Sequence, residues 1–445
     1  MSGIDRRAAL KPLDEADAEP RYSPLAAWCT VAILLLFSLI AVLDRQIIAL
    51  LVEPIKKDLS LSDTELGLLQ GFAFALFYSL AGVPIGWAVD RYSRRIIAYL
   101  GVTVWSLSAA ACGLAGGFWP LFACRTMVGV GEASVTPTAV SLIGDLFPRE
   151  KVGAPMGVYA AGFYVGSGLA LAIGGFVVGL FAGQDSVNFP IIGPVAPWQA
   201  VLLTTGAPGI LIALLAFFLK DARKAIVARA DRPAPSMSAL LADRGRLIAI
   251  TYVGFALAAF VAYAIGAWTP AFLWRKFGLL PQEIGWTWGI VVSVSGAAGA
   301  LLGGFAVDRV HRMGRHDANL IVPAIAALIS WPLLTTAYFL PSPFAVLLTL
   351  GLGMGVFSMI AAGSYATWRQ IAPPQFRGQI TAGFTVASGL LGAGMGPVSV
   401  ALVTDYVFGD EAMVGVSLAI VLSIAIPAIA ILLATARPLA KHLDD

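Results

Sequence analysis

The sequence predicts an all-α integral membrane protein with twelve transmembrane helices in two six-helix halves, on the evidence of composition, apolar runs and an internal repeat. Of its 445 residues, 58% are hydrophobic and only 12% are charged, whereas soluble domains carry about 25% charged residues. The mean hydropathy is +0.84. Apolar runs of roughly 20 residues recur along the chain, long enough to cross a bilayer as helices that satisfy their own backbone hydrogen bonds.

The expected spans follow one another with short polar connections. We place them at residues 25–51, 65–88, 96–116, 119–143, 153–182, 199–219, 247–274, 284–307, 319–340, 343–367, 378–404 and 412–436. The first is too long for a cleaved signal sequence and lacks a small-residue cleavage site, so we expect it to stay in the protein. All three cysteines fall in apolar spans, where a disulfide framework is not expected.

The distribution of Lys and Arg predicts the orientation. If the N-terminus is cytoplasmic, the cytoplasmic segments hold 23 of the 29 basic residues, which satisfies the positive-inside rule. We therefore expect both termini in the cytoplasm. The resulting domains are an N-terminal tail, a six-helix half, a basic linker, a second six-helix half and a C-terminal tail, with bounds 1–24, 25–219, 220–246, 247–436 and 437–445.

A repeat supports the division into halves. GWAVDR at 86–91 recurs as GFAVDR at 304–309, each at the cytoplasmic end of the second helix of its half. Duplicated halves with matching topology are typical of one large class of transporters.

The repeated motif predicts a cytoplasmic gate. Gly86 allows two helices to approach closely, and Asp90 can face the positive N-terminal end of a neighbouring helix. The remaining candidate gate residues are basic groups on the anionic membrane surface, an acid before the fifth helix and the second copy of the motif: Arg91, Arg94, Arg95, Asp145, Gly304, Asp308 and Arg309. The alternative is a short basic loop that reflects topology alone.

Four charged residues lie inside expected spans of the N-terminal half. A rise of 1.5 Å per residue puts Asp44 in the first helix at the depth of Arg125 in the fourth. Arg125 and Glu132 are seven residues apart and share one face of the fourth helix, and Arg45 can reach toward Glu132. Intramembrane charges are costly and usually mark ion pathways.

We therefore predict that Asp44 and Glu132 bind protons, with Arg45 and Arg125 as counter-charges. The alternative is a static salt bridge that holds the first and fourth helices together, which suits Arg125 in particular.

The C-terminal half has no Asp, Glu, Lys or Arg away from the ends of its spans. A cavity with one charged and one apolar wall suits an amphipathic cargo with a polar or anionic head. Candidate cavity residues are Tyr263, Ser364, Tyr365, Thr381, Phe384 and Thr385, although most aromatic and hydroxyl side chains in such spans serve packing or face lipid.

Two stretches resemble the major facilitator superfamily. GWAVDRYSRR at 86–95 is similar to its signature loop between helices two and three, and RTMVGVGE at 125–132 to its fourth-helix motif. The fifth helix lacks the Gly-Pro pair of the superfamily's drug/proton antiporters. Residues 43–91 resemble spinster-type transporters, whose animal members move lysophospholipids or sphingosine phosphate. The resemblance implies a major facilitator fold and assigns Asp44, Arg45, Arg125 and Glu132 to the family's polar site.

The sequence thus predicts a proton-coupled secondary transporter of a lipid-like substrate, working by alternating access. Its alternatives are a small organic anion or drug transporter, and a lipid sensor or scaffold that does not transport. We find no phosphate-binding loop or catalytic motif, so we expect no enzyme, and the three histidines lack metal-ligand spacing. We expect no cofactor besides the proton gradient, no nucleic-acid partner, contact with membrane lipids, a monomer, and a bacterial inner-membrane location.

Overall fold

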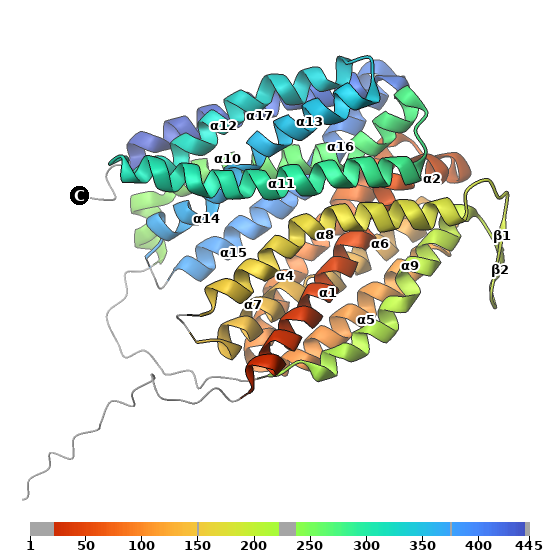
Figure 1. Ribbon diagram of the computed structural model, residues 1–445, viewed down its shortest axis with the longest axis horizontal. Coiled ribbons are helices and arrows are strands. Elements are labelled where there is room, and N and C mark those ends of the chain that lie inside the picture. Colours follow the sequence, from red (N-terminus) through yellow and green to blue (C-terminus); the bar gives the residue numbers. More distant parts are fainter. Residues whose placement is uncertain (1–21, 149–150, 222–236, 374–375, 441–445) are drawn as a thin grey trace, which may run out of the picture.

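The structure, a computed structural model, describes residues 22–148, 151–221, 237–373 and 376–440. Long helices run roughly side by side through the molecule, and the N-terminal half lies beside the C-terminal half (Figure 1). We call the two ends of this bundle the hairpin end, which carries a small β-hairpin, and the linker end, where both halves approach the linker.

Helices α1 to α9 make up the N-terminal half, together with a π-helical turn η1, a 3-10 turn η2 and the hairpin strands. Their bounds are α1 Pro24–Leu50, α2 Val52–Leu59, α3 Asp63–Gly67, η1 Leu68–Phe72, α4 Ala73–Arg91, α5 Arg94–Cys112, α6 Phe118–Glu132, α7 Val135–Leu146, α8 Gly153–Leu180, β1 Val187–Phe189, β2 Gly193–Val195, α9 Pro197–Ala213 and η2 Leu214–Phe218. The antiparallel strands pair Val187 with Val195.

Helices α10 to α17 make up the C-terminal half. Their bounds, with the π-helical turns η4 and η5 and the 3-10 turns η3 and η6, are α10 Met237–Phe277, α11 Pro281–Arg312, α12 Ala318–Thr336, η3 Ala337–Phe339, α13 Pro343–Ser358, α14 Ile360–Ile371, α15 Arg377–Ala387, η4 Ser388–Gly394, α16 Met395–Leu402, η5 Val403–Phe408, η6 Glu411–Met413 and α17 Val414–Ala440.

Eleven helices of the described residues are long and apolar enough to span a membrane. The remaining expected span is the fourth, which is interrupted at Ala133 and Ser134 and so forms two shorter helices, α6 and α7. Pro137 explains the interruption, because proline lacks an N–H and its ring clashes with the carbonyl four residues earlier. The corresponding helix of the C-terminal half is also interrupted, at Met359 between α13 and α14.

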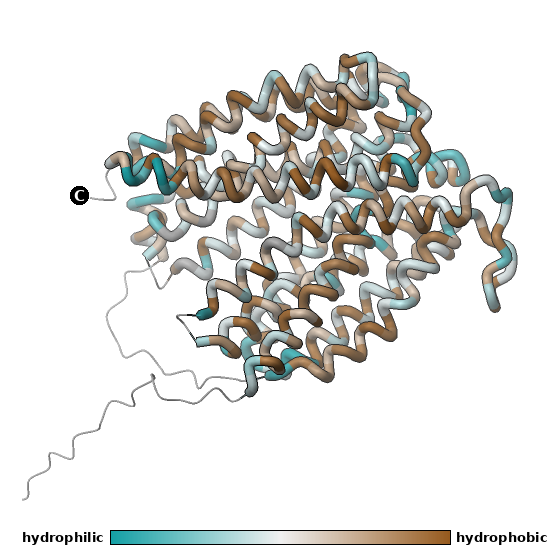
Figure 2. The backbone as a smooth tube through the Cα atoms, viewed as in Figure 1, coloured by the Kyte–Doolittle hydropathy of each residue, from teal (hydrophilic) through white to brown (hydrophobic). Residues whose placement is uncertain are grey.

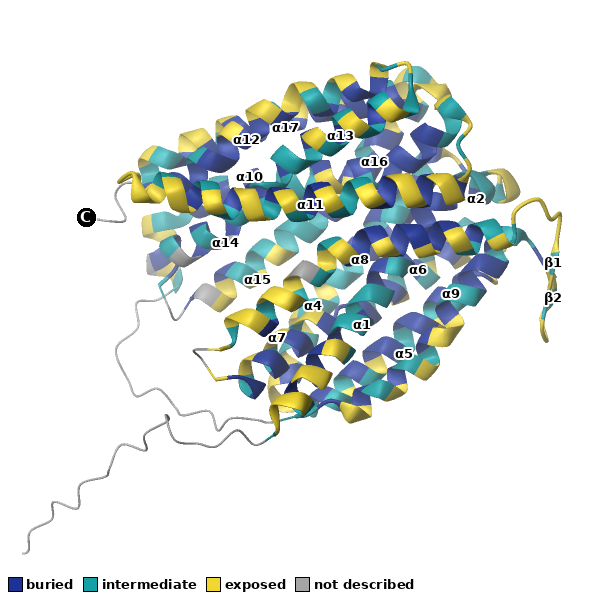
Figure 3. Ribbon diagram, in the orientation of Figure 1, coloured by how far each residue is buried: buried dark blue, intermediate teal, exposed yellow. Residues whose placement is uncertain are grey.

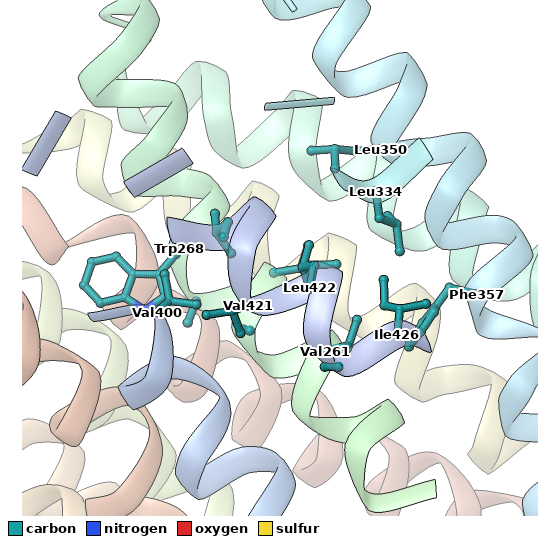
Figure 4. Packing of buried hydrophobic residues seen from close by; sticks show 14 of the residues in the cluster. Val261, Trp268, Leu334, Leu350, Phe357, Val400, Val421, Leu422 and Ile426 are labelled. Carbon is teal, nitrogen blue, oxygen red and sulfur yellow. The ribbon is translucent and has the colours of Figure 1, made fainter. Parts of the chain in front are cut away.

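The apolar residues are distributed as a membrane protein requires. Hydrophobic residues extend over the outer faces of the helices (Figure 2), and many outer-facing positions are exposed (Figure 3). Leu211 and Phe305, for example, are 72% and 68% exposed, which suits contact with lipid tails rather than water. Inside the C-terminal half, Trp268, Leu422 and Ile426 belong to a closely packed core (Figure 4).

The expected domain bounds change where the structure describes them. Helix α10 begins at Met237, so the last ten residues of the expected linker are helical and continue into the seventh span. The middle of the linker at 222–236, most of the N-terminal tail and residues 441–445 lie outside the described residues. Helix α17 reaches Ala440 and so includes the start of the expected C-terminal tail.

Candidate functional site

Glycines in α6 bring the fourth helix into close contact with α4 and α5. A Cβ atom on Gly129 would lie 2.5 Å from the carbonyl oxygen of Phe74, and one on Gly131 would lie 2.6 Å from the backbone nitrogen of Trp105. A side chain at either position would therefore force the packed helices to shift apart. The pattern therefore fixes α6 so that Glu132, its last residue, faces into the half.

Arg45 and Glu132 form a buried ion pair between α1 and α6. The Arg45 Nε donates to Glu132 Oε2 at 2.6 Å, and Arg45 Nη2 lies 2.5 Å from the same oxygen. The Glu132 side chain is 0% exposed, whereas the Arg45 side chain is 24% exposed. The contact expected from helix geometry is thus present, and Arg45 is the more exposed of its two partners.

Asp44 and Arg125 lie at one level, but their side chains do not pair. Arg125 Nη1 donates to the backbone carbonyl of Asp44 at 3.3 Å, and both residues are almost fully buried. Asp44 Oδ2, Arg125 Nε and Glu132 Oε1 are buried without a hydrogen-bond partner among the described residues. Buried polar atoms of this kind usually bind water, a proton or a ligand group.

Phe74 is a part of this site that the sequence reasoning missed. Its ring centroid lies 4.8 Å from the guanidinium carbon of Arg45 and 5.8 Å from that of Arg125. One aromatic ring thus makes cation–π contacts with two guanidinium groups. Tyr78, one turn further along α4, stacks on Phe74 and lies 5.5 Å from the Arg45 guanidinium. Aromatic faces stabilise cations that have lost water. Phe74 and Tyr78 are four residues apart in the expected second helix and therefore lie on one face of it, which is the sequence pattern that could have indicated them.

Of the candidate cavity residues, Tyr263 lies nearest the charged cluster. It comes from α10 in the opposite half, and it is an electrostatic neighbour of Arg45 and Glu132. Tyr263 is nevertheless 37% exposed, so the neighbouring helices do not enclose its side chain fully.

The other candidate cavity residues lie in α14 and α15. The buried Ser364 hydroxyl donates to the carbonyl of Ala361, so its hydrogen bond is made within its own helix. Phe384 packs against Trp368 with ring centroids 4.9 Å apart. Thr385 is exposed and donates to the carbonyl of Thr381. The side chain of Tyr365 lies outside the described ones.

In the candidate gate, the described ion pairs lie within the N-terminal half. Arg94 Nη2 lies 2.6 Å from Asp145 Oδ2, and the backbone N–H of Arg94 donates to Asp221 at 3.2 Å. Arg91 lies over the ring of Trp87 at 4.2 Å. The Arg94 contacts join the linker ends of α5 and α7 and the residues after η2, whereas the contact of Arg91 with Trp87 lies within α4.

The expected close approach at the motif glycines is not present in this arrangement. A Cβ atom on Gly86 or Gly304 would meet no atom within 4 Å. Asp90, Asp308 and Arg309 are exposed at the ends of their helices, and Arg95 is partly buried. The two halves therefore do not meet at these glycines, and the linker end is the more open end here.

At the hairpin end the halves are joined by an ion cluster that the sequence analysis did not predict. Arg275 of α10 holds Asp63 through Nη1 at 2.6 Å and Nη2 at 2.8 Å, and Glu53 through Nε at 2.7 Å. Lys56 bridges Asp63, at 2.7 Å, and Glu411 of the C-terminal half. Burial raises the pKa of Glu53 above its usual 4.5, which Arg275 opposes.

A second contact between the halves lies close to this cluster. The hydroxyl and backbone N–H of Thr64 both donate to Asp405, at 2.7 and 2.6 Å. A Cβ atom on Gly71 would lie 2.7 Å or less from the carbonyl oxygens of Ala393 and Gly394, and one on Gly175 2.9 Å from that of Pro281. Glycines thus let the halves approach along two seams near the hairpin end.

Comparison with known proteins agrees with this arrangement. The family model for the Major Facilitator Superfamily matches residues 34–397. An MFS-type efflux pump of Mycolicibacterium smegmatis is 26% identical over 95% of this chain and 96% of its own length. Human protein spinster homolog 1 is 27% identical over 86% of this chain and 74% of its own.

A solved structure shares the fold. The inward-facing, unoccupied crystal structure of a bacterial homologue of the human lysosomal transporter spinster has a TM-score of 0.78 and 24% identity, covering 95% of this chain and 98% of that one. The twelve-helix plan, the repeated halves and the family match lead to one conclusion. The chain is a transporter of the major facilitator superfamily that resembles the spinster family, and it is not an enzyme.

Proposed function

We propose that this protein is a proton-coupled secondary active transporter that moves an amphipathic, lipid-like substrate of the lysophospholipid or sphingosine-phosphate type. The observation that carries the proposal is the Arg45–Glu132 pair, in which a carboxylate with no exposed surface meets a base that is partly accessible. Asp44 lies beside it as a second buried acid. Ionisable groups inside a membrane protein are costly and are retained for function.

Alternating access fits the contacts between the halves. At the hairpin end, the pairs Arg275–Asp63 and Lys56–Glu411 join the two halves. At the linker end, a Cβ atom on Gly86 or Gly304 would meet no atom within 4 Å. With both termini in the cytoplasm of a bacterial cell, as the basic residues favour, the site opens to the cytoplasm. Closing the linker end around the gate motif would then complete the cycle.

Two observations support a lipid-like cargo. The N-terminal half carries the buried charges, whereas the spans of the C-terminal half have no Asp, Glu, Lys or Arg away from their ends, and several relatives are spinster proteins. The M. smegmatis relative named an efflux pump favours a second candidate, export of a drug-like molecule by the same mechanism.

Flux through proteoliposomes under an imposed pH gradient tests both candidates. We would compare a lysophospholipid, a sphingosine phosphate and a cationic dye in wild type, in Glu132→Gln and in Glu283→Gln, an exposed acid at the hairpin end. Gradient-driven flux that is lost only in Glu132→Gln supports proton coupling, and the cargo that moves decides between the candidates. Flux that ignores the gradient, or an unaffected Glu132→Gln, contradicts it.

A further inference from the structure

The β-hairpin between α8 and α9 carries its apolar residues at its tip, which we define as residues 189–192. Figure 2 shows a hydrophobic tip and a more hydrophilic base, and Figure 3 shows that the tip is exposed. Ile191 is fully exposed, and Ile192 beside it is also exposed. Residues 183–196 contain one charged side chain, that of Asp185 at the base, and no Lys or Arg. The hairpin is thus divided along its length into a polar base and an apolar tip.

The backbone at Ile191 is unusual for this residue type. Its φ is +71°, in the left-handed region that β-branched residues rarely adopt and that turns usually fill with Gly, Asn or Asp. The turn is therefore destabilised by the residue it carries. A bulky apolar side chain that is fully exposed at such a position points to a contact outside the chain.

The base of the hairpin is fixed to the helices, so the tip has a defined position. The backbone N–H of Ala196 donates to Gln199 Oε1 at 2.9 Å, and Gln199 Nε2 donates to the carbonyl of Ala115 at 3.3 Å. On the other strand's side, Gln184 donates to the carbonyl of Leu180 at 3.3 Å. From this base the strands run across the direction of the long helices (Figure 1). The tip therefore extends sideways at the hairpin end.

Exposed side chains at the hairpin end mark the edge of the lipid. Trp119 near the start of α6, Trp286 near the start of α11 and Tyr406 of η5 are each more than half exposed. Trp and Tyr gather where a bilayer meets water. Leu180, the last residue of α8, is also more than half exposed, which suits contact with lipid. The lipid-facing surface of α8 thus continues to the base of the hairpin.

We propose that the tip of the hairpin inserts into the membrane leaflet at the hairpin end, so that the partner of this surface is the lipid itself. Phe189, Ile191 and Ile192 enter the boundary between headgroups and acyl chains, while Asp185 stays in water. A protein partner fits less well, because four residues cannot supply the roughly 800 Å² per partner of a stable interface. The tip also lacks charges that would orient such a partner. Since α8 and α9 both belong to the N-terminal half, the hairpin anchors that half to the leaflet.

Electron paramagnetic resonance of the full chain in liposomes of phosphatidylethanolamine and phosphatidylglycerol tests the proposal. A spin label is attached at Ile191→Cys or, as the control on the same hairpin, at the exposed Asp185→Cys, with Cys29, Cys112 and Cys124 replaced by Ser. Collisions with oxygen, which partitions into lipid, are compared with collisions with a nickel chelate, which stays in water. We expect the label at position 191 to collide more with oxygen and the label at position 185 more with the chelate.

A second pair of proteins leaves the tip free of the label. The label is placed at Asn188, an exposed residue of β1, in a chain with either Ile191 or Ile191→Gly. Glycine accepts a positive φ, so the turn is retained while the apolar side chain is lost. We expect the ratio of inserted to free hairpin to fall about tenfold, measured as more frequent collisions of the Asn188 label with the nickel chelate.

Three outcomes overturn the proposal. In the first, the label at position 191 collides with the nickel chelate as often as the label at position 185, which means that the tip lies in water. In the second, the label at position 191 meets neither reagent and its spectrum shows coupling between labels, which means that a second copy of the chain covers the tip. In the third, the Asn188 label does not respond to Ile191→Gly.

Discussion

Replacement of Arg275 by Ala should open the hairpin end. Its guanidinium joins the two halves through Asp63 and Glu53, and the exposed side-chain fractions are only 6% for Arg275, 0% for Asp63 and 18% for Glu53. Removing one partner of a buried pair costs about 3–5 kcal/mol. Because Lys56 still neutralises Asp63 at 2.7 Å, we take the lower bound of about 3 kcal/mol.

That energy acts on the equilibrium between closed and open hairpin ends. At about 1.4 kcal/mol per factor of ten, the closed-to-open ratio should fall about 100-fold. A wild type that is about 99% closed would then be close to half open. Lys57→Ala is the matched control, because this base is exposed on α2 next to Lys56.

Electron paramagnetic resonance distances between spin labels measure the change. Labels at Gln184 and Phe344, both exposed in opposite halves, report the separation, in a background without the native Cys29, Cys112 and Cys124. Arg275→Ala should add a longer distance that Lys57→Ala does not. If the distance distribution of Arg275→Ala matches wild type, the ion cluster does not hold the halves together and the reasoning is wrong.

Three further predictions concern the site and the linker end. Gly131→Ala should lower the free energy of unfolding by about 1–3 kcal/mol through overpacking. Gly144→Ala is the control, because a Cβ atom at that position would meet no atom within 4 Å. Equal melting temperatures of the two variants would contradict the close helix contact. Phe74→Leu should weaken the site by about 0.5–2 kcal/mol through loss of its cation contacts, seen as a lower melting temperature than that of Phe344→Leu. Arginine side chains, Arg315 foremost, hold the pKa of Asp317 at about 2, below its usual 3.8. Its stabilising effect is therefore complete above about pH 4 and is lost toward pH 2, so the melting temperatures of wild type and Asp317→Asn should converge over that range.

The charged site could be predicted because helix geometry is local. Depth along a helix follows from residue counting, which placed Asp44 level with Arg125. The expected contact of Arg45 with Glu132 came instead from the face that Glu132 shares with Arg125 and from the reach of the arginine side chain. The partner atoms could not be predicted in the same way. Arg125 donates to a backbone carbonyl rather than to the Asp44 side chain, since that choice depends on helix rotation and on the neighbouring Phe74.

Contacts between the halves were beyond sequence reasoning for a different reason. Arg275 lies more than 200 residues along the chain from both Glu53 and Asp63. Its pairing with them depends on which end of the molecule is closed. The same dependence explains Gly86, whose expected close neighbour is absent while the linker end is open. The interruption of the fourth helix could have been read from Pro137, six residues before the expected end of that span.

The pairing of α1 with α6 has a consequence for biogenesis. The first helix leaves the ribosome with Asp44 and Arg45 in its apolar sequence, and the partner of Arg45 arrives only with Glu132, 87 residues later. Until then each charge carries an insertion cost of about 2.5–3.5 kcal/mol. A nascent chain that stops before Phe118 therefore inserts its first span with unpaired charges, whereas one that extends past Leu146 can assemble the complete cluster within the bilayer. The apolar remainder of the first helix therefore has to offset about 2.5–3.5 kcal/mol for each charge until the fourth helix has been made.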